Sequence, residues 1–225
     1  MISIAIDGPA GAGKSTISKK LAAELGFVYV DTGALYRAVG LYMLEHGTQP
    51  GDAQAVSAAL PQVTVELAYR EGVQRVLLCG RDVSDAIRTP EVSMAASAVS
   101  AIPAVRAFLF ETQKEMARRH NIVMDGRDIG TVVLPDAQIK IFLTASAADR
   151  ARRRYEELKA KGEDVRYEDV LADLEQRDHN DSTRAVAPLK PAPDAARIDT
   201  SGNTLEESVA LLLSHVKSRL AALEH

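Results

Sequence analysis

The strongest constraint on this chain is a glycine-rich stretch near the N-terminus, residues 8–16, which reads Gly-Pro-Ala-Gly-Ala-Gly-Lys-Ser-Thr. It fits the pattern G-x-x-x-x-G-K-S/T. A β-branched run at residues 2–6 precedes it, and Ile17, Leu21 and Leu25 follow it as one apolar stripe at helical spacing. This order of strand, loop and helix predicts a phosphate-binding loop rather than a glycine turn with an accidental lysine.

Two physical features of such a loop favour anions. Glycines let the backbone curl so that successive N–H groups point inward, and the N-terminus of the following helix adds partial positive charge. We therefore expect Lys14 to reach the β- and γ-phosphates of a nucleoside triphosphate. The hydroxyl of Ser15 is expected to bind Mg²⁺ beside them.

Composition narrows the class of protein. The 225 residues suit one domain with an insertion, and 46% hydrophobic with 26% charged residues is ordinary for a soluble protein. No apolar run approaches membrane-spanning length and the N-terminus enters a core strand, so we expect no membrane segment, no signal peptide and a cytoplasmic location. The single cysteine, Cys79, excludes an internal disulfide framework and is expected to be a small core residue. A net charge of −4 disfavours a nucleic-acid groove.

The alternation of strands with helices predicts a parallel sheet with right-handed crossovers. Further strands are expected at residues 27–30, 121–124, 138–143 and 196–199. Ligands gather at the carboxyl ends of such strands, which places Asp31, Thr32 and Arg37 near the phosphate loop. Two plainer interpretations remain open: Asp31 and Thr32 also fit a helix cap, and Arg37 also fits a solvated helix face.

Residues 51–89 follow a different pattern. Apolar and polar residues alternate over residues 63–69, a turn is expected at residues 71–72, and short strands are expected at residues 76–79 and 82–84. This predicts a small antiparallel meander inserted into the α/β chain. The insert is either a stabilising appendage or a flap on the substrate side, and its place between the phosphate loop and the next core strand favours the flap.

Charged side chains gather at three further places. Residues 125–131 follow a buried strand and hold three ionisable groups in their first four positions, which favours function over a polar loop. Arg106 lies in a first helical turn, where a cation opposes the macrodipole, so it indicates either a ligand or a solvated side chain. A later helix carries Arg150, Arg152, Arg153 and Arg154. Such clusters are usually solvated, but beside a triphosphate they supply the fixed cations that phosphoryl transfer needs.

Three classes of nucleotide-binding protein compete at this point. A GTP-dependent switch needs a guanine-reading Asn-Lys-x-Asp, which the sequence lacks. A motor usually shows an apolar strand ending in consecutive acids, and residues 124–127 match that poorly. A small-molecule kinase fits the supply of arginines best, because two bound phosphates repel and need fixed cations and Mg²⁺ between them. The acceptor phosphate is itself a nucleophile, so no dedicated base is expected.

Five motifs together resemble the bacterial cytidylate kinases, which are nucleoside monophosphate kinases with a phosphate loop. They lie at residues 8–16, 31–37, 87–92, 125–133 and 184–189. The resemblance covers almost the whole chain, including the insert. It implies an α/β fold with a three-layer kinase core around a parallel sheet, in one unit over residues 1–225. It also implies an acceptor-binding region at about residues 36–103 with the β insert at about 61–90, and a lid at about 150–166.

The resemblance implies phosphorylation of CMP and dCMP by ATP with Mg²⁺. We expect a monomer, without nucleic-acid or membrane partners. The resemblance assigns ATP binding to Gly8, Pro9, Ala10, Gly11, Ala12, Gly13, Lys14, Ser15 and Thr16. It assigns the acceptor phosphate to Arg37, Arg127 and Arg184, the cytosine to Ser97, Arg106 and Asp128, and the sugar to Arg177 and Asp181. The catalytic side chains would be Lys14, Arg153, Arg154 and Arg184. The alternatives are a kinase of another small molecule and a non-enzymatic nucleotide switch.

The assignment of Asp128 to the base also makes physical sense by itself. Cytosine offers an amino donor at N4, for which a carboxylate is the natural acceptor, whereas uracil places a repelling oxygen there. The sequence departs from the family at Thr32, where members often have serine. The hydroxyl is retained, and the small added methyl group bears only on the fine sugar or phosphate contact of Thr32.

Overall fold

The computed structural model describes residues 1–70 and 73–223. The chain separates into two compact units, which we describe one at a time. The sheet unit comprises Met1–Tyr29, His120–Thr183 and the C-terminal part from Ala187. The insert unit comprises Val30–Arg119 and Arg184–Val186. The boundary between them falls inside a strand, and the insert unit extends beyond the acceptor-binding region predicted at residues 36–103.

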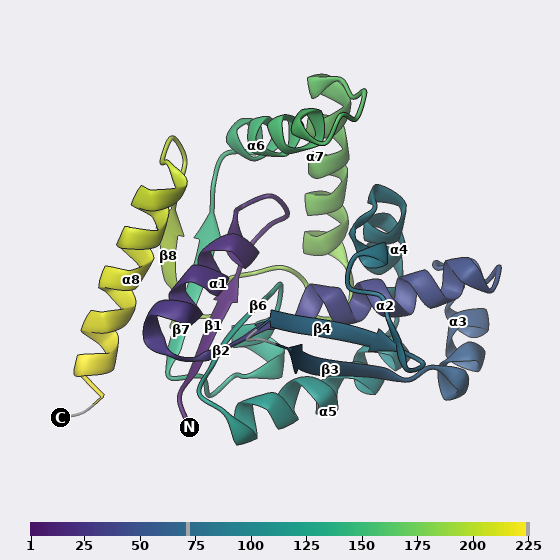
Figure 1. Cartoon of the computed structure of the whole chain (residues 1–225), viewed down its shortest axis with the longest axis horizontal. Coiled ribbons are helices and arrows are strands. Elements are labelled where there is room, and N and C mark those ends of the chain that lie inside the picture. Colours follow the sequence, from purple (N-terminus) through teal and green to yellow (C-terminus); the bar gives the residue numbers. More distant parts are fainter. Residues whose placement is uncertain (71–72, 224–225) are drawn as a thin grey trace. The chain divides into compact units, whose positions relative to one another are not determined.

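A five-stranded sheet organises the first unit, in the order β2-β6-β1-β7-β8 (Figure 1). Its strands are β1 (Ser3–Asp7), β2 (Val28–Asp31), β6 (Ile122–Gly126), β7 (Ile139–Thr144) and β8 (Ala196–Asp199). β1 pairs in parallel with β6 and β7, and β7 pairs in parallel with β8. Every residue of β1 is buried, as expected for the central strand of a parallel sheet. The predicted α/β class with a parallel sheet is confirmed.

Two helices, α1 (Lys14–Leu25) and α8 (Leu205–Ala221), pack against the β-branched side chains of this sheet. They contribute Ile17 and Leu21 from α1, and Leu212 and Val216 from α8. Of the three layers expected, the sheet unit therefore supplies the sheet and one helical layer. The helix α8 begins with a reciprocal capping box between residues 204 and 207.

A second helical pair in the sheet unit is formed by α6 (Ala147–Ala160) and α7 (Tyr167–Thr183), which lie together in Figure 1. Their apolar faces share a cluster with Ala10 of the phosphate loop, to which Ala151, Leu158, Val170 and Leu174 contribute. The helix pair is thus packed directly on the loop. The predicted lid, residues 150–166, covers most of α6 and the connection to α7, and its movement stays a prediction.

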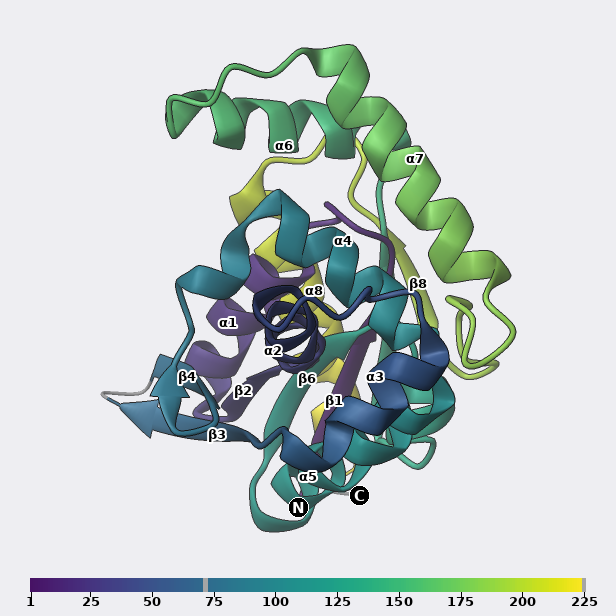
Figure 2. The ribbon, with the colours of Figure 1, turned by 90° about the vertical axis from the view of Figure 1, so that its right-hand side faces the viewer.

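The insert unit has its own apolar core and a small antiparallel sheet of order β3-β4-β5. Figure 2 shows two of these strands, β3 and β4, side by side. Its helices are α2 (Thr32–Glu45), α3 (Ala53–Ala59), α4 (Pro90–Ser100) and α5 (Pro103–Arg119), with short 3₁₀ turns η1 (Leu60–Gln62) and η2 (Ala86–Arg88). Its strands are β3 (Val65–Arg70), β4 (Val73–Leu78) and β5 (Arg81–Asp82). The predicted antiparallel insert is confirmed, and the turn predicted at residues 71–72 lies outside the described residues.

Two local predictions in the insert are wrong. Cys79, expected in the core, is exposed at the turn between β4 and β5, where its φ of 48° ends the strand at Leu78. The third strand covers Arg81–Asp82 rather than residues 82–84, because Ser84 leaves the ladder. Its hydroxyl instead donates to Asp82 and accepts the N–H of Val76. The alternation of side chains alone does not show where a meander turns.

Among the described residues, no single helix combines the length and hydropathy needed to cross a membrane. The bent pair of α4 and α5 meets both criteria only when its two helices are taken together.

Candidate active site

The phosphate loop connects β1 to α1 in the sheet unit, as predicted. Gly8 has a φ of 154°, and a Cβ there would lie 1.9 Å from the carbonyl oxygen of Leu143, so only glycine fits. Gly13 precedes α1 in a left-handed conformation and offers no side-chain cap to the helix N-terminus. The first N–H groups of α1 therefore have the orientation and partial charge that favour an anion.

Lys14 lies buried at the base of this loop, where its ammonium donates to the carbonyl oxygen of Pro9 at 2.7 Å. Burial lowers the pKa of Lys14 well below its usual value, and the nearby guanidinium groups of Arg127 and Arg177 lower it further. Asp125 and Asp7 oppose this effect. Three predicted site residues, Lys14, Arg127 and Arg177, are thus close enough to interact, and their positive charges favour an anion among them.

Ser15 points at a carboxylate that our sequence analysis placed in the loop after β6 without giving it a role. Its hydroxyl donates to Asp125 at 2.8 Å, and the hydroxyl of Tyr29 donates to the other oxygen of Asp125 at 2.9 Å. A serine hydroxyl beside a buried carboxylate fits Mg²⁺, which prefers oxygen ligands and keeps several for water and phosphate. The signal in the sequence was an apolar strand that ends in an acid.

The loop after β6 also pairs two residues predicted to contact the acceptor. Arg127 donates to Asp181 of α7 at 2.8 Å, and Asp181 is buried. Burial alone would lower the pKa of Arg127, but Asp181, Asp125 and Asp178 raise it above its usual value. The next residue, Asp128, is also buried, so each charge in this segment is either paired or enclosed. That pattern agrees with the functional interpretation of residues 125–131.

Within the insert unit, Asp31 connects three elements. It caps α2 by accepting the N–H of Ala34, and it pairs with Arg88 of η2 at 3.0 Å. Gln74 of β4 accepts the N–H of Asp31, so the meander is tied to the end of β2. Burial would raise the pKa of Asp31, but Arg37 and Arg88 together lower it. The helix cap is confirmed, and Arg37 lies half-buried beside a carboxylate rather than on a fully solvated face.

A second cluster in the insert unit gathers three predicted residues around Ser100. The Ser100 hydroxyl donates to the carbonyl oxygen of Ser97 and accepts from Arg184 at 3.1 Å. Arg106 is buried, donates to the carbonyl oxygen of Ser100 at 3.3 Å and lies over the ring of Tyr36. The solvated interpretation of Arg106 is therefore wrong. Ser97, Arg106 and Arg184 share one neighbourhood although they are far apart in the sequence.

Comparison with known proteins decides the family. A family model described as cytidylate kinase matches residues 4–218. The chain belongs to the cytidylate kinase family. The cytidylate kinases of Caldicellulosiruptor bescii and Fervidobacterium nodosum are both 51% identical to it, and they align over 94% and 96% of each chain, respectively. An uncharacterized protein from Eubacterium ventriosum, of known structure, has a TM-score of 0.53 at 13% identity over 97% of this chain and 99% of its own. That last likeness concerns the fold alone.

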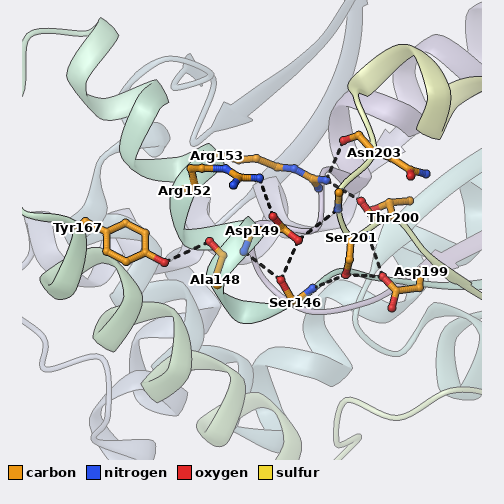
Figure 3. Close-up of polar contacts among 11 residues, drawn as sticks. Ser146, Ala148, Asp149, Arg152, Arg153, Tyr167, Asp199, Thr200, Ser201 and Asn203 are labelled. Atoms are coloured by element: carbon orange, nitrogen blue, oxygen red, sulfur yellow. Dashed lines mark hydrogen bonds and ion pairs between the residues drawn. The ribbon is translucent and has the colours of Figure 1, made fainter.

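Membership of the cytidylate kinase family makes the chain a nucleotide-binding phosphotransferase, as residues 8–16 predicted. The arginines of α6, however, take different roles, and Figure 3 shows two of them, Arg152 beside Asp149 and Arg153 reaching Thr200 and Asn203. Arg153 donates to the carbonyl oxygens of Thr200 and Asn203, at 2.8 and 3.3 Å. Arg154 pairs with Glu157 on the same helix. Neither guanidinium is bound at the phosphate loop in this structure, so their predicted catalytic role remains a prediction.

Arg150, in contrast, has a structural role in this member of the cytidylate kinase family. It is 5% exposed, and it donates to the carbonyl oxygens of Ala145 and Ala10 at 2.9 and 2.8 Å. Its third partner is Asp178 of α7 at 2.6 Å. One side chain thus fastens α6 and α7 to the phosphate loop. The sequence showed four arginines of equal appearance, and only their partners distinguish them.

Proposed function

We propose that the chain transfers the γ-phosphoryl group of ATP to CMP or dCMP, giving ADP and CDP or dCDP. The match to the cytidylate kinase family over residues 4–218 carries this proposal. The site geometry supports it, because the buried lysine of the phosphate loop interacts electrostatically with Arg127 and Arg177, and Arg127 is also paired with Asp181 of α7. The monomeric state and the cytoplasmic location expected from the sequence stay predictions.

The donor side of the reaction belongs to the sheet unit. In this proposal residues 8–16 hold the phosphates of ATP, with Lys14 balancing charge on the transferring group. Ser15 and Asp125 would hold Mg²⁺, which when bound supplies positive charge and orients the phosphates. The acceptor phosphate is already a nucleophile, so alignment and fixed positive charge supply most of the rate.

The acceptor side draws on the groups described above. We assign the acceptor phosphate to Arg37, Arg127 and Arg184, the base to Ser97, Arg106 and Asp128, and the sugar to Thr32, Arg177 and Asp181. Arg153 and Arg154 would close on the transferring phosphoryl group. To do so, Arg153 must leave the carbonyl oxygens of Thr200 and Asn203, and Arg154 must leave Glu157.

The experiment that tests the proposal is a panel of nucleoside monophosphates and deoxynucleoside monophosphates with ATP and Mg²⁺. We expect diphosphate to form from CMP and dCMP faster than from UMP, AMP or GMP, measured by chromatography of the nucleotides. Nucleotide binding without any diphosphate would favour a non-enzymatic switch. If no member of the panel accepts a phosphoryl group from ATP but another small molecule does, the chain is a kinase of that other acceptor.

Asp128→Asn should reduce the preference for cytosine. An amide in place of the carboxylate loses acceptor strength towards the N4 amino group and no longer repels the O4 of uracil. Because a good base contact discriminates by about 1–3 kcal/mol, we expect the ratio of kcat/KM for CMP over UMP to fall about tenfold to a hundredfold. Asp136→Asn, at an exposed position of the same segment, is the matched control. An equal loss for both substrates would remove Asp128 from base recognition.

A further inference from the structure

The last residue of β1 carries a carboxylate that the mechanism above does not use. Asp7 is 3% exposed, and both of its oxygens are occupied by consecutive backbone groups. Oδ1 accepts the N–H of Ile129 at 2.7 Å, and Oδ2 accepts the N–H of Gly130 at 2.8 Å. These two groups open the π-helical turn η3 (Ile129–Val133), where a helix start leaves N–H groups without partners of its own.

This contact joins two parts of the proposed site. Asp7 directly precedes the phosphate loop, and Ile129 directly follows the pair Arg127–Asp128. The ladder between β1 and β6 ends with the pairing of Asp7 and Gly126, so the backbone beyond Gly126 is no longer held by the sheet. Beyond that point, the hydrogen bonds from Ile129 and Gly130 to Asp7 hold the backbone.

Gly130 packs tightly beside the same carboxylate. A Cβ at Gly130 would lie 3.4 Å from Oδ2 of Asp7 and 3.3 Å from Cδ of Lys140, so an alanine there would require a shift of a few tenths of an ångström. Gly130 offers a second, independent way to disturb the same contact.

Burying a carboxylate at this position is energetically unfavourable. Burial raises the pKa of Asp7 to about 6, against the effect of its two backbone hydrogen bonds. The nearby charge of Asp128 raises this pKa further, while Lys14 lowers it. A buried acid kept next to another acid costs stability, and perturbed groups of this kind concentrate at functional sites.

We infer that Asp7 is a positioning residue, which holds the Arg127–Asp128 segment against the start of the phosphate loop so that the acceptor is aligned with the donor. The inference rests on the proposed function, because Arg127 and Asp128 are there assigned to the acceptor. The hydrogen bonds of the Asp7 side chain go to Ile129 and Gly130, and among the described residues none goes to residues 8–16, although its charge interacts with Lys14. The strand β1 that leads into the phosphate loop is paired on both sides. We therefore expect the loss of Asp7 to affect the acceptor more than ATP.

Asp7→Asn tests the inference, because the amide keeps the size and one acceptor but sets an NH₂ group against one of the two N–H donors. We expect the KM for CMP to rise at least tenfold and the preference for CMP over UMP to fall severalfold. The KM for ATP should stay within about twofold. Gly130→Ala should shift the KM for CMP in the same direction, less strongly, and Asp136→Asn should change neither KM.

Steady-state kinetics with each substrate varied in turn, together with thermal unfolding, distinguish the outcomes. Equal changes in both KM values, or an unchanged KM for CMP in both variants, would show that Asp7 has only a structural role. Should Asp7→Asn fail to fold, Gly130→Ala decides by the same criterion. Wild-type protein that makes no CDP overturns the proposed function and the inference together, whereas active wild type with unaffected variants overturns the inference alone.

Discussion

Lys14→Ala is expected to lower kcat/KM for CMP phosphorylation about a hundredfold to a thousandfold, the effect of removing one preorganised group that stabilises charge in a transition state. Lys14 is the buried cation of the phosphate loop, hydrogen-bonded to Pro9 and close enough to Arg127 and Arg177 to interact with their charges. Its loss removes positive charge where the transferring phosphoryl group would lie. Coupled measurement of ADP release with CMP present and absent gives the value.

The same substitution should leave the fold intact. Burial and neighbouring cations lower the pKa of Lys14, which means that the protein around it disfavours its charge. Removing that charge should therefore keep or raise the unfolding midpoint. Lys20→Ala, an exposed lysine of the same helix, is the matched control and should retain activity. Activity within twofold of wild type in Lys14→Ala would refute the assignment of the loop.

Arg150→Ala should lower the free energy of unfolding by about 3 kcal/mol, the lower end of the usual cost of breaking a buried ion pair, because the side chain of Asp178 is 24% exposed. The arginine is buried, and its loss leaves the carboxylate of Asp178 and the carbonyl oxygens of Ala10 and Ala145 without their donor. It also loosens α6 and α7 from the phosphate loop. Denaturant unfolding followed by circular dichroism measures the loss.

Two comparisons make this result specific. Arg152→Ala removes an exposed arginine from the same helix, which pairs with Asp149, and should cost about 0–1 kcal/mol. The double variant Arg150→Met with Asp178→Leu should regain much of the loss, because it leaves no uncompensated buried charge. A loss in Arg150→Ala no larger than in Arg152→Ala would contradict the clamping role of Arg150.

Most of the secondary structure was predictable because it depends on local sequence patterns. The strands of the parallel sheet were placed within about a residue or two of their observed limits, since a buried parallel strand reads as a continuous apolar run. The cap of α2 followed from Asp31. The phosphate loop was the clearest case, because its pattern includes the flanking strand and helix.

Side-chain partners were much less predictable. Asp7 looked like an ordinary acid at a strand end, Asp125 received no role of its own, and Arg150 looked like its neighbours, because their partners lie more than a hundred residues away in the sequence or on another helix. Cys79 looked like a core residue because the apolar run before it did not show where the strand would turn. Local sequence reports charge and hydropathy, whereas function here depends on which distant groups meet.

The seating of Gly8 on the backbone of Leu143 affects how a mutational scan of this protein should be interpreted. No side chain fits at position 8, so every substitution there would push β1 away from β7 before nucleotide chemistry is involved. Loss of function after a substitution at position 8 would therefore reflect failed folding and low protein abundance, and not a loss of catalysis. A catalytically dead yet well-folded protein, useful as a trap for bound nucleotides, has to be sought at Lys14 instead.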